Sequence, residues 1–170
     1  MIKYKNEGGQ SLIGKHKRNI EGKPLVSIIT IVRNGEKYLE NAIKSVINQT
    51  YENIEYIIID GRSTDGTLDI IATYNESIDY WISEADSGIS DAFNKGVNLA
   101  NGELIGIVNS DDWLESNAVE IIVSHLDKKI SVYCGNLKLY DRNLNIIKTR
   151  KYTPICVQNK ANKYCDSCLL

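Results

Sequence analysis

Two adjacent aspartates, Asp111 and Asp112, come just after a short apolar run at residues 104–108. A run of this length and composition predicts a strand that is buried on both faces. In extended backbone, consecutive side chains point to opposite sides, so one carboxylate can face a bound metal while the other orients a ligand or a loop. Ser, Asn and Asp are also ordinary turn residues, so a solvated turn is the alternative. The residues at the ends of the other strands decide between the two.

Acidic residues follow two more apolar runs. Asp60 ends one run, and Glu84 and Asp86 come directly after a shorter one. In open α/β sheets, ligands bind outside the carboxyl ends of the strands, so we expect these side chains to share one edge with the aspartate pair. Carboxylates that cluster without a matching row of Lys or Arg are unfavourable unless a hard cation or a proton is present. We therefore expect Mg²⁺ or Mn²⁺, held by few carboxylates and by the phosphates of a substrate.

The elements that position these residues alternate along the chain. Short β-branched runs predict strands, and apolar residues at helical spacing predict helices between them. Strands are expected at 25–32, 54–59, 79–83, 104–108 and 131–134, followed by a hairpin of 138–140 with 146–148. Helices are expected at 38–49, after 63–65, after 90 and after 116. This order implies parallel strands joined by right-handed crossovers.

The third helix has its own start signal. Ser90 can cap it, and Asp91 in the first turn interacts favourably with the helix dipole. Phe93, Val97 and Ala100 recur at helical spacing and are expected to form its apolar stripe.

Composition also predicts the boundaries of the domain within the chain. Residues 1–23 are polar and lack apolar periodicity, which predicts a mobile N-terminal extension that ends before Pro24. The domain is expected to cover 24–150, and 151–170 to form a tail outside it.

Charge and hydropathy narrow the function classes. A net charge of -2 gives no electrostatic reason to expect a nucleic-acid partner. No apolar run approaches the ~20 residues that cross a bilayer, and no apolar signal core opens the chain, so we expect a cytoplasmic protein. The basic residues at 15–18 leave a peripheral contact with the inner face of the plasma membrane open, with a solvated arm as the alternative.

Five segments resemble the motifs of family 2 glycosyltransferases of the GT-A fold, in the same order and spacing. They lie at residues 26–34, 45–51, 59–67, 84–96 and 109–113. The resemblance covers about residues 24–148 and is closest to bacterial members that build surface or capsular polysaccharide. It implies an α/β, Rossmann-like fold for nucleotide-diphospho-sugar transferases, with a mainly parallel central sheet flanked by helices and with the C-terminal acceptor part missing.

The same resemblance implies roles for individual residues. It places Asp60 in the nucleotide pocket, makes Asp111 and Asp112 a variant DxD motif, and assigns the metal to Asp112. It also implies that Ile31 and Arg33 flank the base and ribose, and that Asp86 and Asp91 lie around the sugar donor.

Two of these roles have alternatives, and the identity of the donor's base stays open. The segment 60–63 can be a plain strand-to-helix turn, and Asp91 can serve only as a helix N-terminal charge. Many relatives carry a second aspartate where this chain has Gly61, so the base of the donor, a UDP- or GDP-sugar, stays open.

The implied activity is transfer of a hexose from a nucleotide-diphosphate donor to a hydroxyl of a saccharide or lipid-linked acceptor, metal-dependent and with inversion. Polysaccharide or glycolipid synthesis is the implied process. Residues 157–170 match no family motif, so we expect a longer enzyme interrupted near Cys156, with its general base beyond the chain end. The alternative is a non-catalytic remnant that binds nucleotide sugar. A nucleotidyltransferase is disfavoured because the basic glycine-rich loop is absent.

Overall fold

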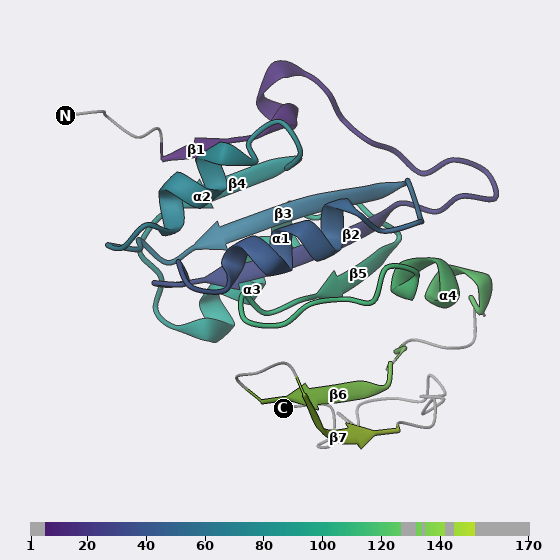
Figure 1. The fold of residues 1–170 in the computed structure, drawn as a ribbon. Helices are drawn as coiled ribbons and strands as arrows, with labels where there is room; N and C mark the ends of the chain where they lie inside the picture. Colours follow the sequence, from purple (N-terminus) through teal and green to yellow (C-terminus); the bar gives the residue numbers. More distant parts are fainter. Residues whose placement is uncertain (1–5, 127–131, 134, 142–144, 152–170) are drawn as a thin grey trace. The chain divides into compact units, whose positions relative to one another are not determined.

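The computed structural model describes residues 6–126, 132–133, 135–141 and 145–151. The chain divides into two compact units, Met1–Ile121 and Ile122–Leu170. The first unit contains a five-stranded sheet, and the second contains a two-stranded hairpin (Figure 1).

The sheet of the first unit is mainly parallel. Its strands, in spatial order, are β1 (Glu7–Gly8), β4 (Tyr80–Ser83), β3 (Ile54–Asp60), β2 (Val26–Val32) and β5 (Leu104–Ile107). Strands β2, β3, β4 and β5 run parallel, and β1 pairs antiparallel with β4. The expected parallel strands and their order along the chain are therefore confirmed.

Helices connect the parallel strands. They are α1 (Leu39–Ile47), α2 (Thr67–Thr73) and α3 (Ile89–Leu99). Helix α4 (Ala118–Ser124) follows β5, and a short 3₁₀ helix, η1 (Gln10–Ile13), follows β1. Helices α1 and α3 lie on opposite faces of the sheet (Figure 1). Every residue of β2 and β3 is buried, because these central strands are covered on both faces.

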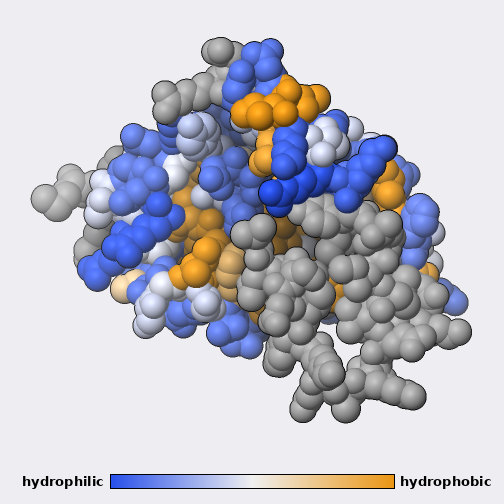
Figure 2. Space-filling view, turned by 90° about the horizontal axis from the view of Figure 1, so that it is seen from below, coloured by the Kyte–Doolittle hydropathy of each residue, from blue (hydrophilic) through white to orange (hydrophobic). Residues whose placement is uncertain are grey.

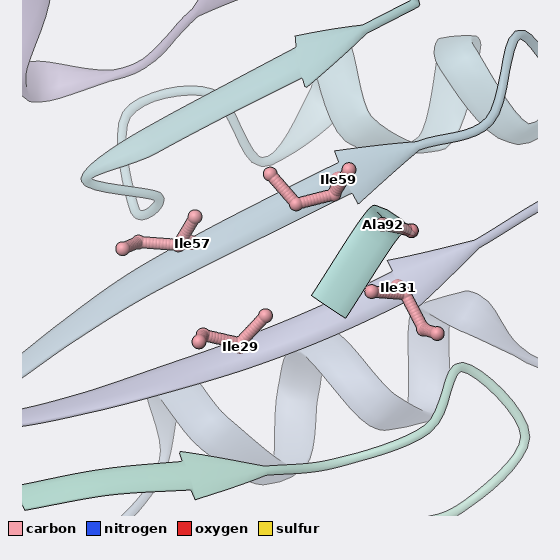
Figure 3. Packing of buried hydrophobic residues seen from close by; sticks show 5 residues of the cluster. All are labelled: Ile29, Ile31, Ile57, Ile59 and Ala92. Carbon is pink, nitrogen blue, oxygen red and sulfur yellow. The ribbon is translucent and has the colours of Figure 1, made fainter. Parts of the chain in front are cut away.

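The core beneath α3 is built from branched aliphatic side chains. Ile29 and Ile31 of β2, Ile57 and Ile59 of β3, and Ala92 of α3 form one buried cluster (Figure 3). Alternate residues of a strand share a face, so these isoleucines point together toward the helix. This packing fixes the helix that leads away from the end of β4.

Strand β5 differs from the sequence-based expectation. It lies at the edge of the described sheet, and Ile105 and Ile107 are 46% and 53% exposed rather than buried. They share a face with Ser27 and Ile29 of β2, but α3 packs over β2 and β3. Apolar surface is visible among hydrophilic residues when the molecule is viewed from below (Figure 2). The composition of the run could not reveal that one face lacks a covering helix within the described residues.

The described part of the N-terminal segment is attached to the sheet, whereas its composition predicted a free extension; its mobility stays a prediction. Glu7 and Gly8 pair with Ile82 and Trp81 of β4, which hides the edge of that strand. Further along, Lys17 Nζ lies 2.9 Å from Oδ2 of buried Asp79. Backbone pairing of a two-residue strand leaves no periodicity in the sequence, which is why composition alone suggested a free arm.

The boundaries and the buried face of helix α3 also differ from those predicted from the sequence. It begins before Ser90, and its N-cap is Gly88, with φ at 120°. Its buried residues are Ala92 and Gly96, whereas Val97 is 41% exposed. Phe93 and Ala100 are partly buried against the same cluster, so two residues of the expected apolar stripe face the sheet and Val97 does not.

In the second unit, β6 (Leu137–Tyr140) and β7 (Ile146–Arg150) pair antiparallel, which confirms the expected hairpin. Half of the strand expected at 131–134 lies outside the described residues, and the described half, Val132 and Tyr133, belongs to no strand. Across the described ranges, none of the helices has the length and apolar character of a membrane span.

Candidate functional site

The carboxyl ends of β2, β3 and β4 are level with one another, whereas β5 ends opposite Ile29 of β2. Val32 of β2 stands opposite Asp60 of β3, and Asp60 stands opposite Ser83 of β4. Beyond the strands, the N–H of Gly61 donates to the carbonyl of Val32 (2.8 Å), and that of Glu84 donates to the carbonyl of Asp60 (3.0 Å). The loops after β2, β3 and β4, which carry Arg33, Gly61 and Asp86, therefore start together on one edge.

The carboxylate of Asp60 is fully buried at this edge and is surrounded by protein donors. Its Oδ2 accepts the N–H of Ser63 (3.0 Å) and the hydroxyl of Ser83 (2.6 Å), and its Oδ1 accepts the hydroxyl of Ser63 (2.5 Å). These bonds close the turn after β3 and join it to β4. Asp60 thus shapes the edge, as the strand-to-helix alternative describes, and its place in a nucleotide pocket stays a prediction.

Two hydroxyl groups, which the sequence suggested only as helix caps or not at all, connect the loops after β2 and β3. Ser63 Oγ accepts the N–H of Asn34 (2.7 Å) while donating to Asp60. Thr67 Oγ1 accepts the N–H of Gly35 (2.9 Å) in the same way while donating to Asp65. Each hydroxyl uses both its donor and its acceptor capacity. The segment 59–67 therefore holds the loop that follows β2.

Left-handed backbone occurs in both of these loops. Asn34 has φ at 53° and Arg62 has φ at 59°, and they are the non-glycine residues with positive φ in the described chain. Such conformations are uncommon outside glycine and are enriched where local structure over-determines the backbone.

Arg33, Gly61 and Asp86 meet above the ends of β2 and β3. A Cβ atom placed on Gly61 would lie 2.4 Å from Oδ2 of Asp86 and 3.5 Å from Cβ of Arg33. The carboxylate of Asp86 therefore occupies the space that a side chain at position 61 would need. This contact links the loops after β2, β3 and β4. A glycine at position 61 leaves room for the Asp86 carboxylate at this edge, which a larger residue would not.

Asp91 faces its own helix and the preceding loop. Its Oδ2 accepts the N–H of Ser87 (3.0 Å) and lies 3.5 Å from Nζ of Lys95. The hydrogen bond from Ser87, with the nearby Lys95, lowers the pKa of Asp91. A helix N-terminal role is thus visible in the geometry, and a role beside the donor stays a prediction. Lys95, four residues after Asp91, went unnoticed in the sequence although this spacing favours an ion pair.

Asp111 and Asp112 are exposed in a turn after β5. The N–H of Asp112 donates to the carbonyl of Asn109 (3.1 Å), and Nδ2 of Asn109 donates to Oδ2 of Asp112 (3.0 Å). A Cβ on Gly35 would lie 3.6 Å from Oγ of Ser110, so this turn lies beside the loop that follows β2. Asp111 and Asp112 therefore lie in an exposed turn, and this turn is next to the edge that carries the other predicted site residues.

A metal site built from protein alone is not found in the described residues, which contain no group of three or more His, Cys, Asp or Glu placed to hold one ion. The carboxylates of Asp111 and Asp112 still suit a hard cation, because Mg²⁺ and Mn²⁺ bind carboxylate oxygens and complete their coordination with water and phosphate. Ile31, the remaining predicted residue, is 9% exposed within the buried cluster (Figure 3), and its place beside a base stays a prediction.

Known proteins resemble this chain in sequence. It is 38% identical to the chondroitin synthase of Escherichia coli over 125 residues, which are 72% of this chain and 18% of that protein. It is 32% identical to glycosyltransferase GlyG of Streptococcus pneumoniae over 123 residues, 70% of this chain and 41% of the relative. The chain spans less than half the length of each of these relatives.

Solved structures resemble it in fold. One is S. aureus TarS 1-349 in complex with UDP-GlcNAc, with a TM-score of 0.54, 25% identity, and coverage of 59% of this chain and 30% of that one. Another is the mannosyltransferase PcManGT from Pyrobaculum calidifontis with GDP-Man and Mn²⁺, with a TM-score of 0.57, 20% identity, and coverage of 76% and 39%. These matches confirm the expected GT-A fold.

The model of the glycosyl transferase family 2 matches residues 27–167. The matched range starts near the expected domain start and ends within the segment 151–170, whose assignment as a separate tail stays a prediction. Because this range makes up most of the chain, the chain belongs to glycosyl transferase family 2.

Proposed function

We propose that this chain binds a nucleoside-diphosphate sugar at the carboxyl edge of β2, β3 and β4 and takes part in transferring the sugar to a hydroxyl acceptor. The observation that carries the proposal is the meeting of Arg33, Gly61 and Asp86 on that edge, in a chain of family 2. It brings a glycine backbone, the first carbon of an arginine side chain and a carboxylate together where α/β sheets bind ligands.

The nucleotide end of the donor is assigned to this meeting point. Arg33 and Ile31 flank the base and ribose, and Asp60 keeps the turn beneath them in shape through Ser63 and Ser83. TarS has been solved with UDP-GlcNAc and PcManGT with GDP-Man, which supports a nucleotide sugar and leaves both bases as candidates. Asp86 and Asp91 border the sugar side of the donor.

The diphosphate is assigned to the turn after β5. Asp112, with Asp111 beside it, would hold Mg²⁺ or Mn²⁺, and the diphosphate itself would complete the coordination. The Mn²⁺ in the PcManGT structure supports this choice of ion. When bound, such an ion offsets the negative charge that develops on the leaving diphosphate. The protein's own contribution is the turn in which Asn109 orients the Asp112 carboxylate.

The chemical step is displacement at the anomeric carbon. The acceptor hydroxyl forms the new glycosidic bond as the bond to the diphosphate breaks, and a carboxylate base takes the hydroxyl proton. Attack from the face opposite the leaving group inverts the anomeric centre. A hexose as the transferred sugar, and a saccharide or lipid-linked acceptor on the cytoplasmic side of the membrane, complete the proposal; the likeness to chondroitin synthase supports polysaccharide synthesis.

A calorimetric titration tests the donor site directly. The full chain is titrated with UDP and with GDP, in Mn²⁺ and then in chelator, alongside Asp112→Ala and the control Asp69→Ala, which lies on α2. We expect binding of one nucleotide that needs Mn²⁺ and is lost in Asp112→Ala only. Binding that ignores both the chelator and Asp112→Ala would contradict the metal assignment, and no binding of either nucleotide would overturn the donor site.

A further inference from the structure

Lys95 of α3 contacts several residues of the loop between β4 and α3 and of the first turn of α3. Its ammonium lies 2.9 Å from Oε1 of Glu84, donates to the carbonyl of Ala85 (2.9 Å) and lies 3.5 Å from Oδ2 of Asp91. Its side chain is only 25% exposed, so the charge is partly shielded from solvent. One cation thus connects the start of the loop to the first turn of the helix.

The far end of the same loop is closed by two backbone donors. The N–H of Ser87 donates to Asp91 (3.0 Å), and the N–H of Gly88 donates to Oδ1 of Asp86 (2.9 Å). Gly88 has φ at 120°, a conformation open to glycine, and this lets the chain turn directly into α3. Residues 84–88 are therefore held at both ends.

The three carboxylates of this region have different surroundings. Glu84 and Asp91 both face Lys95, whose pKa is raised by its pairing first with Glu84 and then with Asp91. Asp86 instead directs Oδ2 toward Gly61, while its other oxygen accepts the Gly88 N–H of the same loop. The position of Asp86 over Gly61 therefore depends on the path of the loop.

We propose that Lys95 is a positioning residue for donor binding, which locks residues 84–88 onto α3 and so keeps the Asp86 carboxylate over Gly61. This inference rests on the proposed function, because the donor is what Asp86 meets on that edge. The two carboxylates that pair with Lys95 are 46% and 40% exposed, and ion pairs that reach solvent contribute little to the free energy of unfolding. Lys95 therefore acts on the orientation of one loop and leaves overall stability nearly unchanged.

A double-mutant cycle on the full chain tests the lock. The affinity for UDP or GDP in Mn²⁺ is measured for the unmodified chain, Lys95→Met, Asp86→Asn and the double variant. If Lys95 acts through Asp86, each single change weakens binding about five- to tenfold and the double variant is no weaker than Asp86→Asn. Lys95→Arg keeps the cation and should retain binding. Lys44→Met is the matched control, since it breaks the ion pair with Glu40 (3.0 Å) on α1.

Amide hydrogen exchange supplies a readout that needs no ligand. Lys95→Met should speed the exchange of the Ser87 and Gly88 amides, whereas Lys95→Arg and Lys44→Met should not. Unchanged exchange in Lys95→Met, or losses of affinity that multiply in the double variant, would overturn the lock. If the unmodified chain binds neither nucleotide, the proposed function fails, and the exchange experiment still decides whether Lys95 holds the loop.

Discussion

The hydroxyl of Ser63 accepts the N–H of Asn34 at 2.7 Å, across 29 residues of sequence. Through the same oxygen Ser63 donates to Asp60, so one small side chain connects the loops after β2 and β3. The shape of the carboxyl edge thus depends on groups that do not themselves need to touch a ligand.

Removing that hydroxyl should cost stability. Ser63→Ala leaves the Asn34 N–H and one oxygen of the buried Asp60 carboxylate without this partner, and we expect a loss of about 1–3 kcal/mol in the free energy of unfolding. Urea unfolding measures it. Thr73→Ala is the control, because Thr73 is an exposed hydroxyl that donates only to a carbonyl of its own helix. Equal losses in the two variants would show that the link between the loops adds nothing to the free energy of unfolding beyond an ordinary hydroxyl hydrogen bond.

A side chain at position 61 should displace Asp86. In Gly61→Ala the new Cβ would lie 2.4 Å from Oδ2 of Asp86, closer than van der Waals contact allows, so the carboxylate must move. We expect nucleotide affinity to fall about tenfold. The temperature of unfolding should change little, because Asp86 is only half-buried. Calorimetry and thermal unfolding measure the two quantities. Gly135→Ala, where a Cβ would contact nothing within 4 Å, is the control; unchanged affinity in Gly61→Ala would argue against the assignment of this edge.

Acid should weaken the start of α3 through Asp91. Its pKa in the folded chain lies below the ordinary value of 3.8, first because the Ser87 N–H donates to it and then because Lys95 is near. The stability it contributes is therefore present above about pH 4 and is lost as pH falls through the lowered pKa. Denaturant unfolding between neutral and acid pH checks this, with Asp91→Asn as comparison. The variant should show a flatter pH dependence; identical slopes in the two proteins would rule out a contribution from Asp91.

The N-terminal segment should detach when its cation is removed. Lys17 donates to Asp79, whose carboxylate also accepts the N–H of Tyr56 and is 4% exposed. Lys17→Met leaves that buried charge with one donor fewer, at a cost of about 1–3 kcal/mol. Limited proteolysis should then cleave before Pro24 more quickly. Lys23→Met, which removes only a 3.8 Å contact with exposed Glu52, should behave like the unmodified chain; resistance of Lys17→Met to the protease would contradict the anchor.

Much of the fold could be predicted because the central strands are continuous apolar runs. The alternation of strands and helices from β2 to α4, the parallel sheet, the hairpin, the GT-A fold and the glycosyltransferase family follow from these runs and from the motifs between them, and they are confirmed. The strand expected at 131–134 is not among them. Asp60 and Asp86 could be placed on one edge because parallel strands end together.

The contacts among loop side chains could not be predicted in the same way. Periodicity reports which face of an element is buried, but it says nothing about the path of residues 84–88 or about the space over Gly61. The exposed face of β5 escaped prediction for a related reason. Ile105 and Ile107 have the composition of a core strand, and only the position of α3 shows that no helix covers them within the described residues. The metal and substrate roles of the site residues stay predictions.

The left-handed backbone of Asn34 and Arg62 has a consequence for how this edge stores energy. Asparagine tolerates that conformation, but an arginine there holds strain of about 1 kcal/mol or more that the hydrogen bonds around Asp60 and Ser63 must balance. Replacing Arg62 with glycine would release this strain without disturbing the turn. The backbone of the two loops at the carboxyl edge thus depends on these hydrogen bonds to keep its left-handed residues in place.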